Sequence, residues 1–278
     1  MLITSPQNSR IKEILHLRQG RRRRQAGKFL IDGRREVFRA VACGFPILEV
    51  YFSPELADDE TYAWMKEFDA EYGSRIEVNE VPPALFAKIA YGEREDGVLA
   101  VAEFRELTLE EVFERLPKDQ PPLIGIIEGV EKPGNIGAIL RSADGAGLSA
   151  LVVANPQTDL FNPNTIRASL GTIFSLPVCS DTSENVLAWL QKHHFFTYAA
   201  IVDGAIHYTQ ADFTQPCAIA LGSEAWGLTE QFRGEGIQPI FLPMRGIADS
   251  LNVSTTAAIL FYEAQRQRES ASQQKRKT

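Results

Sequence analysis

Hydrophobic positions in the second half of the chain fall into short runs separated by turn residues and helical stretches. The runs lie at 123–129, 150–155, 196–202, 217–222 and 239–244. Between and after them, helical spacing predicts helices at Ile136–Gly145, Pro163–Phe174, Glu184–His193, Thr229–Arg233 and from Val253 to about Arg268. Short, uniformly apolar strands alternating with helices are typical of a parallel sheet covered on both faces. In such α/β folds, ligands bind beyond the carboxyl ends of the strands.

The first half predicts a smaller α/β unit. Strands at 28–32, 47–53, 75–81 and 97–104 alternate with helices at 35–44, 60–73 and 82–90. The charged helix and proline pair of "ELTLEEVFERLPKDQPP" then have the composition of a linker. We therefore expect an N-terminal arm at 1–27, a small domain at 28–104, a linker at 105–121, a larger domain at 122–268 and a polar tail at 269–278.

Charge is spread unevenly along the 278 residues. Residues 1–40 contain eleven Lys or Arg and three Asp or Glu, a net charge of +8, whereas the remainder carries −15. The run "RRRR" at Arg21, Arg22, Arg23 and Arg24 is the centre of the basic segment. This asymmetry indicates a polyanion-binding arm on an acidic body. The alternative is a solvated face of a helix.

Several classes of protein are disfavoured by what the sequence lacks. It has no run of about 18 apolar residues, which disfavours a membrane span, and its N-terminus has no apolar signal core. Cys43, Cys179 and Cys217 are far apart, and the four histidines have no metal-ligand spacing. We expect a cytoplasmic protein with reduced thiols and no metal site.

A glycine-rich turn, "EKPGNIGAILRSADGAG" at Glu131–Gly147, follows the first run of the second half. Asn135 is a suitable N-cap, and the helical period turns Arg141 about 150° away from the apolar stripe of the helix. Arg141 would then lie near a helix N-terminus that favours anions, unless it simply faces solvent and pairs with Asp144. The turn lacks the G-x-G-x-x-G spacing of a nucleotide-dependent oxidoreductase.

Two later loops follow strands of the same sheet. In "LGSEAWGL", Glu224 lies just beyond a strand end, either as a site residue or as a capping acid in a turn. The segment "FLPMRGIADSLNVSTTAAILFYEAQRQ" combines a long loop with a helix. The apolar positions of this helix form one stripe, at Val253, Ala257, Leu260, Phe261 and Ala264. The stripe predicts a helix that either covers the sheet or contacts a second subunit.

Together with "NPNTIRASLGTIFSLPV", which lies between the first and the second of them, these three segments resemble the SpoU-type (TrmH-like) RNA ribose 2′-O-methyltransferases of the SPOUT superfamily. Residues 28–104 resemble the ribosomal-protein-like substrate-binding domain that precedes the catalytic domain in many members. Two positions depart from the pattern. Asp32 stands in "IDG" where "EG" is expected, and Trp226 is bulkier than the usual residue.

The resemblance implies a parallel sheet with a deep trefoil knot, S-adenosylmethionine as cofactor, and a homodimer with the active site near the subunit interface. It assigns catalytic roles to Arg141, Asn135, Glu224 and Asn252. The cofactor would be held by Leu221, Gly222, Leu242, Met244, Leu251 and Val253. RNA would be bound by Arg21, Arg22, Arg23, Arg24 and Arg141. A guanidinium group stays protonated up to about pH 12. We therefore expect Arg141 to orient the substrate and to stabilise negative charge rather than to act as a base.

The resemblance also implies the substrate class. The additional N-terminal domain favours ribosomal RNA of the 23S type, because members that act on transfer RNA often lack it. Transfer RNA is the alternative for the same chemistry. A non-catalytic RNA-binding relative is the alternative for the whole protein, although all the motif residues that matter are present.

Overall fold

A computed structural model describes residues 1–92, 96–202 and 206–275. By its internal contacts the chain divides into two compact units. Unit 1 comprises Met1–Arg105 and Phe161–Ser175, and unit 2 comprises Glu106–Leu160 and Leu176–Thr278.

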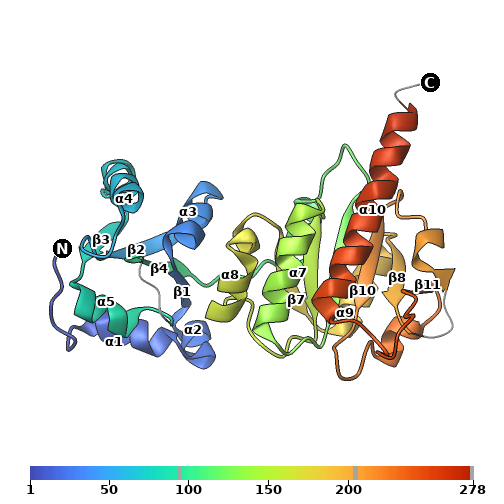
Figure 1. Cartoon of the computed structure of the whole chain (residues 1–278), viewed down its shortest axis with the longest axis horizontal. Helices are drawn as coiled ribbons and strands as arrows, with labels where there is room; N and C mark the ends of the chain where they lie inside the picture. The colour runs from blue at the N-terminus through green and yellow to red at the C-terminus, as the bar shows by residue number, and fades with distance from the viewer. Residues whose placement is uncertain (93–95, 203–205, 276–278) are drawn as a thin grey trace. The chain divides into compact units, whose positions relative to one another are not determined.

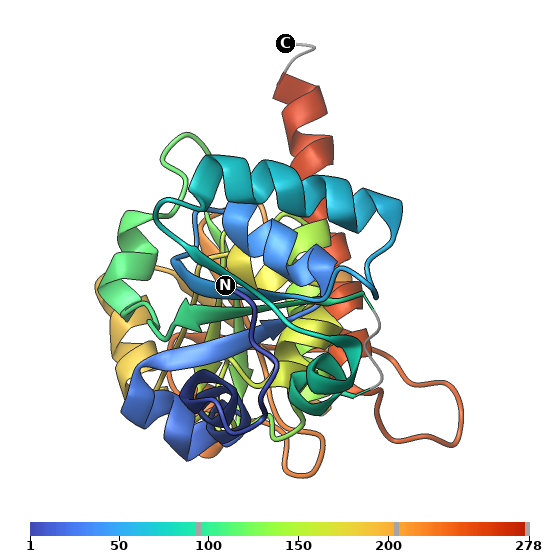
Figure 2. The same ribbon diagram turned by 90° about the vertical axis from the view of Figure 1, so that its left-hand side faces the viewer.

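Unit 1 is built on a four-stranded mixed sheet of order β1-β4-β2-β3. The strands are β1 (Lys28–Asp32), β2 (Ile47–Phe52), β3 (Glu77–Glu80) and β4 (Val98–Glu103). The helices are α1 (Ser9–Leu17), α2 (Gly20–Ala26), α3 (Arg34–Ala42), α4 (Asp59–Tyr72), α5 (Pro83–Ile89) and α8 (Pro163–Ser169). Helices α3 and α4 lie on one face of the sheet, and α1, α2 and α5 lie on the other (Figures 1 and 2). Alternating strand residues such as Leu99 and Val101 therefore pack against α1 and α5.

The first 27 residues do not form a separate arm, which corrects the sequence-based expectation. Ile11, Ile14 and Leu17 of α1 are buried in the core of unit 1, because α1 is amphipathic. In α2, Arg23 is only 2% exposed and donates hydrogen bonds to the carbonyl oxygens of Leu17 (2.9 Å) and Arg18 (3.0 Å). The basic run thus has one structural arginine, and Arg21, Arg22 and Arg24 remain exposed.

The departure at Asp32 has a local explanation. Both carboxylate oxygens of Asp32 accept hydrogen bonds from the Arg18 guanidinium, at 2.6 and 2.7 Å. The backbone N–H of Tyr91 donates to the same carboxylate at 3.0 Å. The paired, hydrogen-bonded Asp32 carboxylate ties the end of α1 to the end of β1 and to the segment after α5.

The segment expected as one helix at Pro163–Phe174 is interrupted. Helix α8 ends where Leu170 (φ +56°) and Gly171 (φ +85°) adopt left-handed conformations, and the 3₁₀ helix η1 (Thr172–Phe174) follows. Phe161 stacks on Phe29 with ring centroids 4.1 Å apart. These aromatic contacts make the segment part of unit 1, although it falls inside the range expected for the larger domain.

Unit 2 contains a seven-stranded sheet of order β7-β6-β5-β10-β8-β11-β9. The strands are β5 (Leu123–Glu128), β6 (Ala150–Ala154), β7 (Val178–Asp181), β8 (Phe196–Ala200), β9 (Ile206–His207), β10 (Cys217–Leu221) and β11 (Ile237–Phe241). Every pairing is parallel, which confirms the expected sheet. The sequence missed β7 and β9, because β7 is half polar and β9 has two residues.

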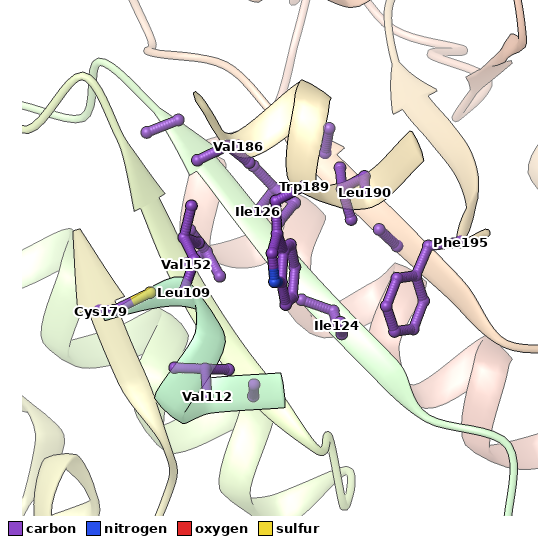
Figure 3. Close-up of a cluster of buried hydrophobic side chains, with 14 of the residues drawn as sticks. Leu109, Val112, Ile124, Ile126, Val152, Cys179, Val186, Trp189, Leu190 and Phe195 are labelled. Atoms are coloured by element: carbon purple, nitrogen blue, oxygen red, sulfur yellow. The ribbon is translucent and has the colours of Figure 1, made fainter. Parts of the chain in front are cut away.

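Helices cover both faces of this sheet. They are α6 (Leu109–Glu114), α7 (Pro133–Gly145), α9 (Ser183–Lys192) and α10 (Val253–Lys275), with the 3₁₀ helices η2 (Tyr208–Gln210) and η3 (Glu230–Arg233). Figure 3 shows Trp189 of α9 lying among strand residues such as Ile126 and Val152. Leu109 and Val112 of α6 join the same cluster. The expectation of a linker at 105–121 is therefore wrong, since its helix contributes to the core.

The last helix is longer than expected and reaches Lys275. Its apolar stripe is buried within unit 2: Val253, Ala257, Leu260, Phe261 and Ala264 are all at most 5% exposed. A carbon added at Gly125 of β5 would lie 3.1 Å from the Phe261 ring, so the stripe packs closely on the sheet of its own chain. The expected polar tail at 269–278 is helical up to Lys275, and 276–278 lie outside the described residues. None of the helices in the described ranges is long and apolar enough to cross a membrane.

Candidate functional site

A pocket of about 200 Å³ opens at the carboxyl ends of β8, β10 and β11. All six residues expected to hold the cofactor line it: Leu221, Gly222, Leu242, Met244, Leu251 and Val253. The strands bring them together because the carboxyl ends of parallel strands share one edge of the sheet. Glu224, expected as a catalytic residue, also lines it. Sequence reasoning missed the other lining residues, which are Ala200, Ile201, Val202, Ser223, Gly227, Ile240, Asp249, Ser250 and Thr256. The first three of these residues could have been identified from the sequence, because they end the apolar run "FTYAAIV".

The pocket has a distinct electrostatic character. Its lining contains two carboxylates, Glu224 and Asp249, and neither Lys nor Arg among the described residues. Leu221 and Val253 are buried and supply apolar walls. A ligand that combines a flat apolar part with a positive charge fits such a pocket, because the carboxylates favour cations.

Three expected catalytic residues meet at one side of this pocket. The carboxylate oxygen Oε1 of Glu224 accepts hydrogen bonds from Nδ2 of Asn135 and from Nδ2 of Asn252, the latter at 3.2 Å. The Asn252 oxygen Oδ1 accepts from N (2.9 Å) and Oγ (2.6 Å) of Ser254, so Asn252 caps α10 while its amide binds Glu224. The cluster joins three separate sequence motifs.

Asn135 is not the N-cap of α7, which corrects the sequence-based expectation. The helix begins at Pro133, with Lys132 in the cap position and no side-chain cap. Proline fits this first position because it needs no N–H partner there. Asn135 therefore lies in the first turn, where its side chain binds Glu224 instead of the helix backbone.

Arg141 lies apart from this cluster in the described chain. Its side chain is exposed on α7, six residues after Asn135. Six residues correspond to about 9 Å along a helix and about 240° around it. Asn135 and Arg141 thus point from different sides of the helix, and the described residues show no contact between Arg141 and the other three.

The loop after β10 folds back on itself. A Cβ atom at Gly222 would lie 1.9 Å from the carbonyl carbon of Gly227 and 2.1 Å from the backbone nitrogen of Leu228. The Gly227 N–H donates to the carbonyl oxygen of Ser223 at 2.9 Å, and Gly227 has a φ of +67°. Glycine at 222 is thus required by the loop's own backbone.

Glu128 anchors this loop, and sequence reasoning missed it. It ends β5, is 2% exposed, and accepts from N (2.7 Å) and Oγ1 (2.8 Å) of Thr229 and from Oγ of Ser183 (2.5 Å). Asn155 extends the network by donating from Nδ2 to Ser183 Oγ at 2.7 Å. Glu128 therefore fixes the far end of the 222–229 loop to the sheet. The sequence does contain a signal for this role, because Glu128 is a carboxylate near the end of the otherwise apolar run "LIGIIEG".

We expect Glu128→Gln to lower the free energy of unfolding by about 1–3 kcal/mol, because the amide replaces one of the two acceptor oxygens with a donor and the charge-assisted hydrogen bonds are lost. The matched control is Glu131→Gln, the same substitution at an exposed position three residues later, with an expected change of about 0.5 kcal/mol or less. Urea unfolding measures both. Equal stabilities of the two variants would contradict the anchoring role of Glu128.

The cysteines supply no reactive group to unit 2. Burial raises the pKa of the Cys179 thiol to about 12 and that of Cys217 to about 11, so both remain protonated at neutral pH. Within the described ranges, no group of three or more His, Cys, Asp or Glu side chains could hold a metal ion.

Known protein families match both parts of the chain. The SpoU rRNA Methylase family matches residues 122–262, and the MRM3-like substrate binding domain matches residues 8–100. Among curated proteins, the chain is 30% identical over 273 residues to the 23S rRNA (uridine(2479)-2′-O)-methyltransferase of Streptomyces viridochromogenes, covering 96% of this chain and 92% of that protein.

Two further similarities differ in extent. The tRNA (guanosine(18)-2′-O)-methyltransferase of Thermus thermophilus is 35% identical over 167 residues, covering 60% of this chain and 84% of that protein. A crystal structure of an AdoMet-bound rRNA methyltransferase from Sinorhizobium meliloti superimposes with a TM-score of 0.86 at 26% identity, covering 96% of this chain and 97% of that one.

Proposed function

Because the chain belongs to the SpoU rRNA methylase family, we propose that it is an RNA methyltransferase that transfers a methyl group from S-adenosylmethionine to a ribose 2′-hydroxyl. The knotted parallel sheet of that family is the fold of unit 2. The observation that carries the proposal is the convergence of all six expected cofactor residues on one pocket. The amide and carboxylate cluster of Asn135, Glu224 and Asn252 lies at its side.

The pocket fits the cofactor by its chemistry. S-adenosylmethionine supplies a methyl group on a positively charged sulfonium. Glu224 and Asp249 place negative charge in the lining, which favours that cation. Leu221, Met244 and Val253 would pack against the adenosyl group, and backbone groups near Gly222, Leu242 and Leu251 would bind its polar atoms.

The chain's own residues would act mainly by positioning. Methyl transfer to a hydroxyl is an in-line displacement, so correct alignment supplies much of the acceleration. Asn135 and Asn252, held by Glu224, would orient the ribose and its phosphate. Arg141 would bind the adjacent phosphate and stabilise the negative charge that develops on the 2′-oxygen.

Ribosomal RNA is the proposed substrate. Similarity to the Streptomyces viridochromogenes rRNA enzyme extends over 96% of this chain, and therefore over both units. The similarity to the Thermus thermophilus tRNA enzyme covers 60% of the chain. Transfer RNA remains the second candidate because the catalytic part resembles both classes. The cytoplasm is the proposed location, since three cysteines that lie far apart in the sequence suit a reducing compartment.

Methyl transfer and cofactor binding test the proposal together. Isothermal titration should detect S-adenosylmethionine binding by the purified protein. Mapping of ribose methylation across total RNA, with and without the gene, should reveal a 2′-O-methyl group in ribosomal RNA that depends on the gene. The absence of both binding and any gene-dependent methylation would reject the proposed function.

The exposed arginines of α2 would form part of the RNA-binding surface. Arginine side chains that neutralise phosphates release counterions, and each contact contributes about −0.7 to −0.9 to the slope of log affinity against log salt. Replacing Arg21, Arg22 and Arg24 together with Gln should therefore flatten the slope by about 2–3 units. Filter-binding titrations with ribosomal RNA at several salt concentrations measure this slope.

Arg23→Gln is the matched control, because the Arg23 guanidinium is buried and binds carbonyl groups of its own chain. This variant should leave the salt slope unchanged and lower thermal stability. An unchanged slope in the triple variant would mean that α2 is a solvated helical face and that RNA binds elsewhere.

We also propose a homodimer that uses the outer face of α7 and α10. The apolar stripe of α10 is already buried in its own chain, so a partner would have to contact other residues. Tyr262 is 51% exposed, and a Cβ at Gly145 would lie 2.9 Å from its Oη, so Tyr262 covers the end of α7. Arg141 lies one turn before Gly145 on the same side of α7. A dimer formed here would bring Arg141 toward the partner.

Light scattering at micromolar concentration should therefore give the mass of a dimer. Tyr262→Glu should shift the protein toward monomer, because it places charge in the proposed interface. Tyr62→Glu, at a half-exposed tyrosine of unit 1, is the control and should remain dimeric. A fully active wild-type monomer would reject the proposed assembly.

A further inference from the structure

We propose that Trp226 is a stacking platform for an unpaired base of the RNA, next to the ribose that is methylated. This inference rests on the proposed function and deepens it, because it specifies the form of RNA that the site accepts. Methyl transfer itself does not require an aromatic residue at this position.

Trp226 is unusually exposed for its type. Its side chain is 87% exposed, whereas tryptophan is normally among the most buried side chains on average. The other two tryptophans behave as expected, since Trp189 is buried in the core of unit 2 and Trp64 packs on Phe68. Among the described residues, no ring stacks on Trp226. A large indole held in solvent has apolar area available for a ligand.

The loop that carries Trp226 is held by contacts at both ends. The 222–228 backbone closes on itself through the contact of Gly222 with Gly227 and the Gly227 N–H bond to Ser223. The backbone N–H of Trp226 donates to Oγ of Ser223 at 3.2 Å. At its far end the loop is fixed by Thr229 on buried Glu128. A fixed backbone reduces the conformational entropy lost when a ligand stacks on the indole.

The surroundings favour a nucleobase over a protein partner. Trp226 is two residues from Glu224, which binds the amides of Asn135 and Asn252. Its neighbours in the loop, Ala225 and Gly227, are small, so it does not belong to a continuous apolar surface in this loop, as an interface core would need. A single aromatic ring beside a polar cluster is the arrangement that binds unstacked bases, by stacking on the face and hydrogen bonding near the edge.

The consequence is selectivity for the form of the RNA. Bases inside a duplex are stacked on each other and cannot offer a face to Trp226. The site should therefore favour a loop, bulge or single-stranded segment, whatever its sequence, because every base has a face that can stack.

The test compares three variants of the full chain on two probes, a 12-nucleotide single-stranded RNA and a duplex of the same length. Trp226→Ala should raise the Kd for the single strand by about 5- to 150-fold and leave the Kd for the duplex within about 2-fold. Trp226→Phe should recover most of the loss, because it restores an aromatic face. Ile247→Ala removes another fully exposed apolar side chain and should change neither Kd.

Two further measurements on Trp226→Ala separate the possible outcomes. Its affinity for S-adenosylmethionine and its mass by light scattering should equal those of the wild type. An unchanged Kd for the single strand, or an equal loss on the duplex, would overturn the stacking role. Dissociation of a wild-type dimer by Trp226→Ala would also overturn it, since Trp226 would then bind a second copy of the chain. If the wild type methylates RNA, none of these results would contradict the proposed function.

Discussion

Arg141→Lys is expected to lower kcat/KM for methyl transfer by about 100-fold or more. Lysine keeps the positive charge but presents a compact ammonium in place of a planar fork with five donors. Loss of a preorganised donor to developing negative charge costs about 100- to 1,000-fold in rate. The variant should fold normally because Arg141 is exposed on α7.

The control is Arg233→Lys, at an exposed arginine of the same unit that pairs with Glu230. It should retain wild-type kinetics. The Kd for S-adenosylmethionine should stay within a few-fold in both variants, because Arg141 does not line the pocket. Near-normal turnover by Arg141→Lys, measured with labelled cofactor, would remove Arg141 from the catalytic role.

Gly222→Val is expected to weaken S-adenosylmethionine binding by about 30-fold or more. A Cβ at this position would lie 1.9 Å from the backbone of Gly227, so the loop must open and the pocket that it lines must change shape. Because backbone atoms cannot move aside as a flexible side chain can, we expect overpacking to lower stability by about 1–3 kcal/mol as well.

Gly246→Ala is the matched control in the neighbouring loop, where an added Cβ meets nothing within 4 Å. It should bind the cofactor like the wild type. Isothermal titration measures both affinities. Unchanged cofactor affinity in Gly222→Val would mean that the pocket lies elsewhere.

These predictions depend on features of different origin. The parallel sheet of unit 2 was predictable because each strand is a short apolar run, and burial on both faces requires that pattern. The six residues expected to hold the cofactor came from the family resemblance, and the structure places all six around one pocket. The resemblance of four ordered motifs then assigned their chemistry.

Other features followed from contacts that no local pattern encodes. The burial of Arg23 within a run of four arginines depends on the carbonyl groups of Leu17 and Arg18. The helix at 109–114 has the composition of a charged linker, but its apolar side packs in the core of unit 2. Asn135 has the residue type of an N-cap, but its amide binds Glu224, 89 positions away in the sequence.

The sequence by itself therefore determined the α/β class, because that class depends on periodicity. It also determined the resemblance to a family, because four ordered motifs carry it. Only the tertiary structure decided the surroundings of Glu128, Gly222 and Trp226. Glu128 binds both Ser183 and Thr229, Gly222 accommodates a backbone five residues further on, and the Trp226 side chain is 87% exposed. These surroundings are set by which distant atoms come within a few ångströms, and hydrophobic spacing carries no information about that proximity.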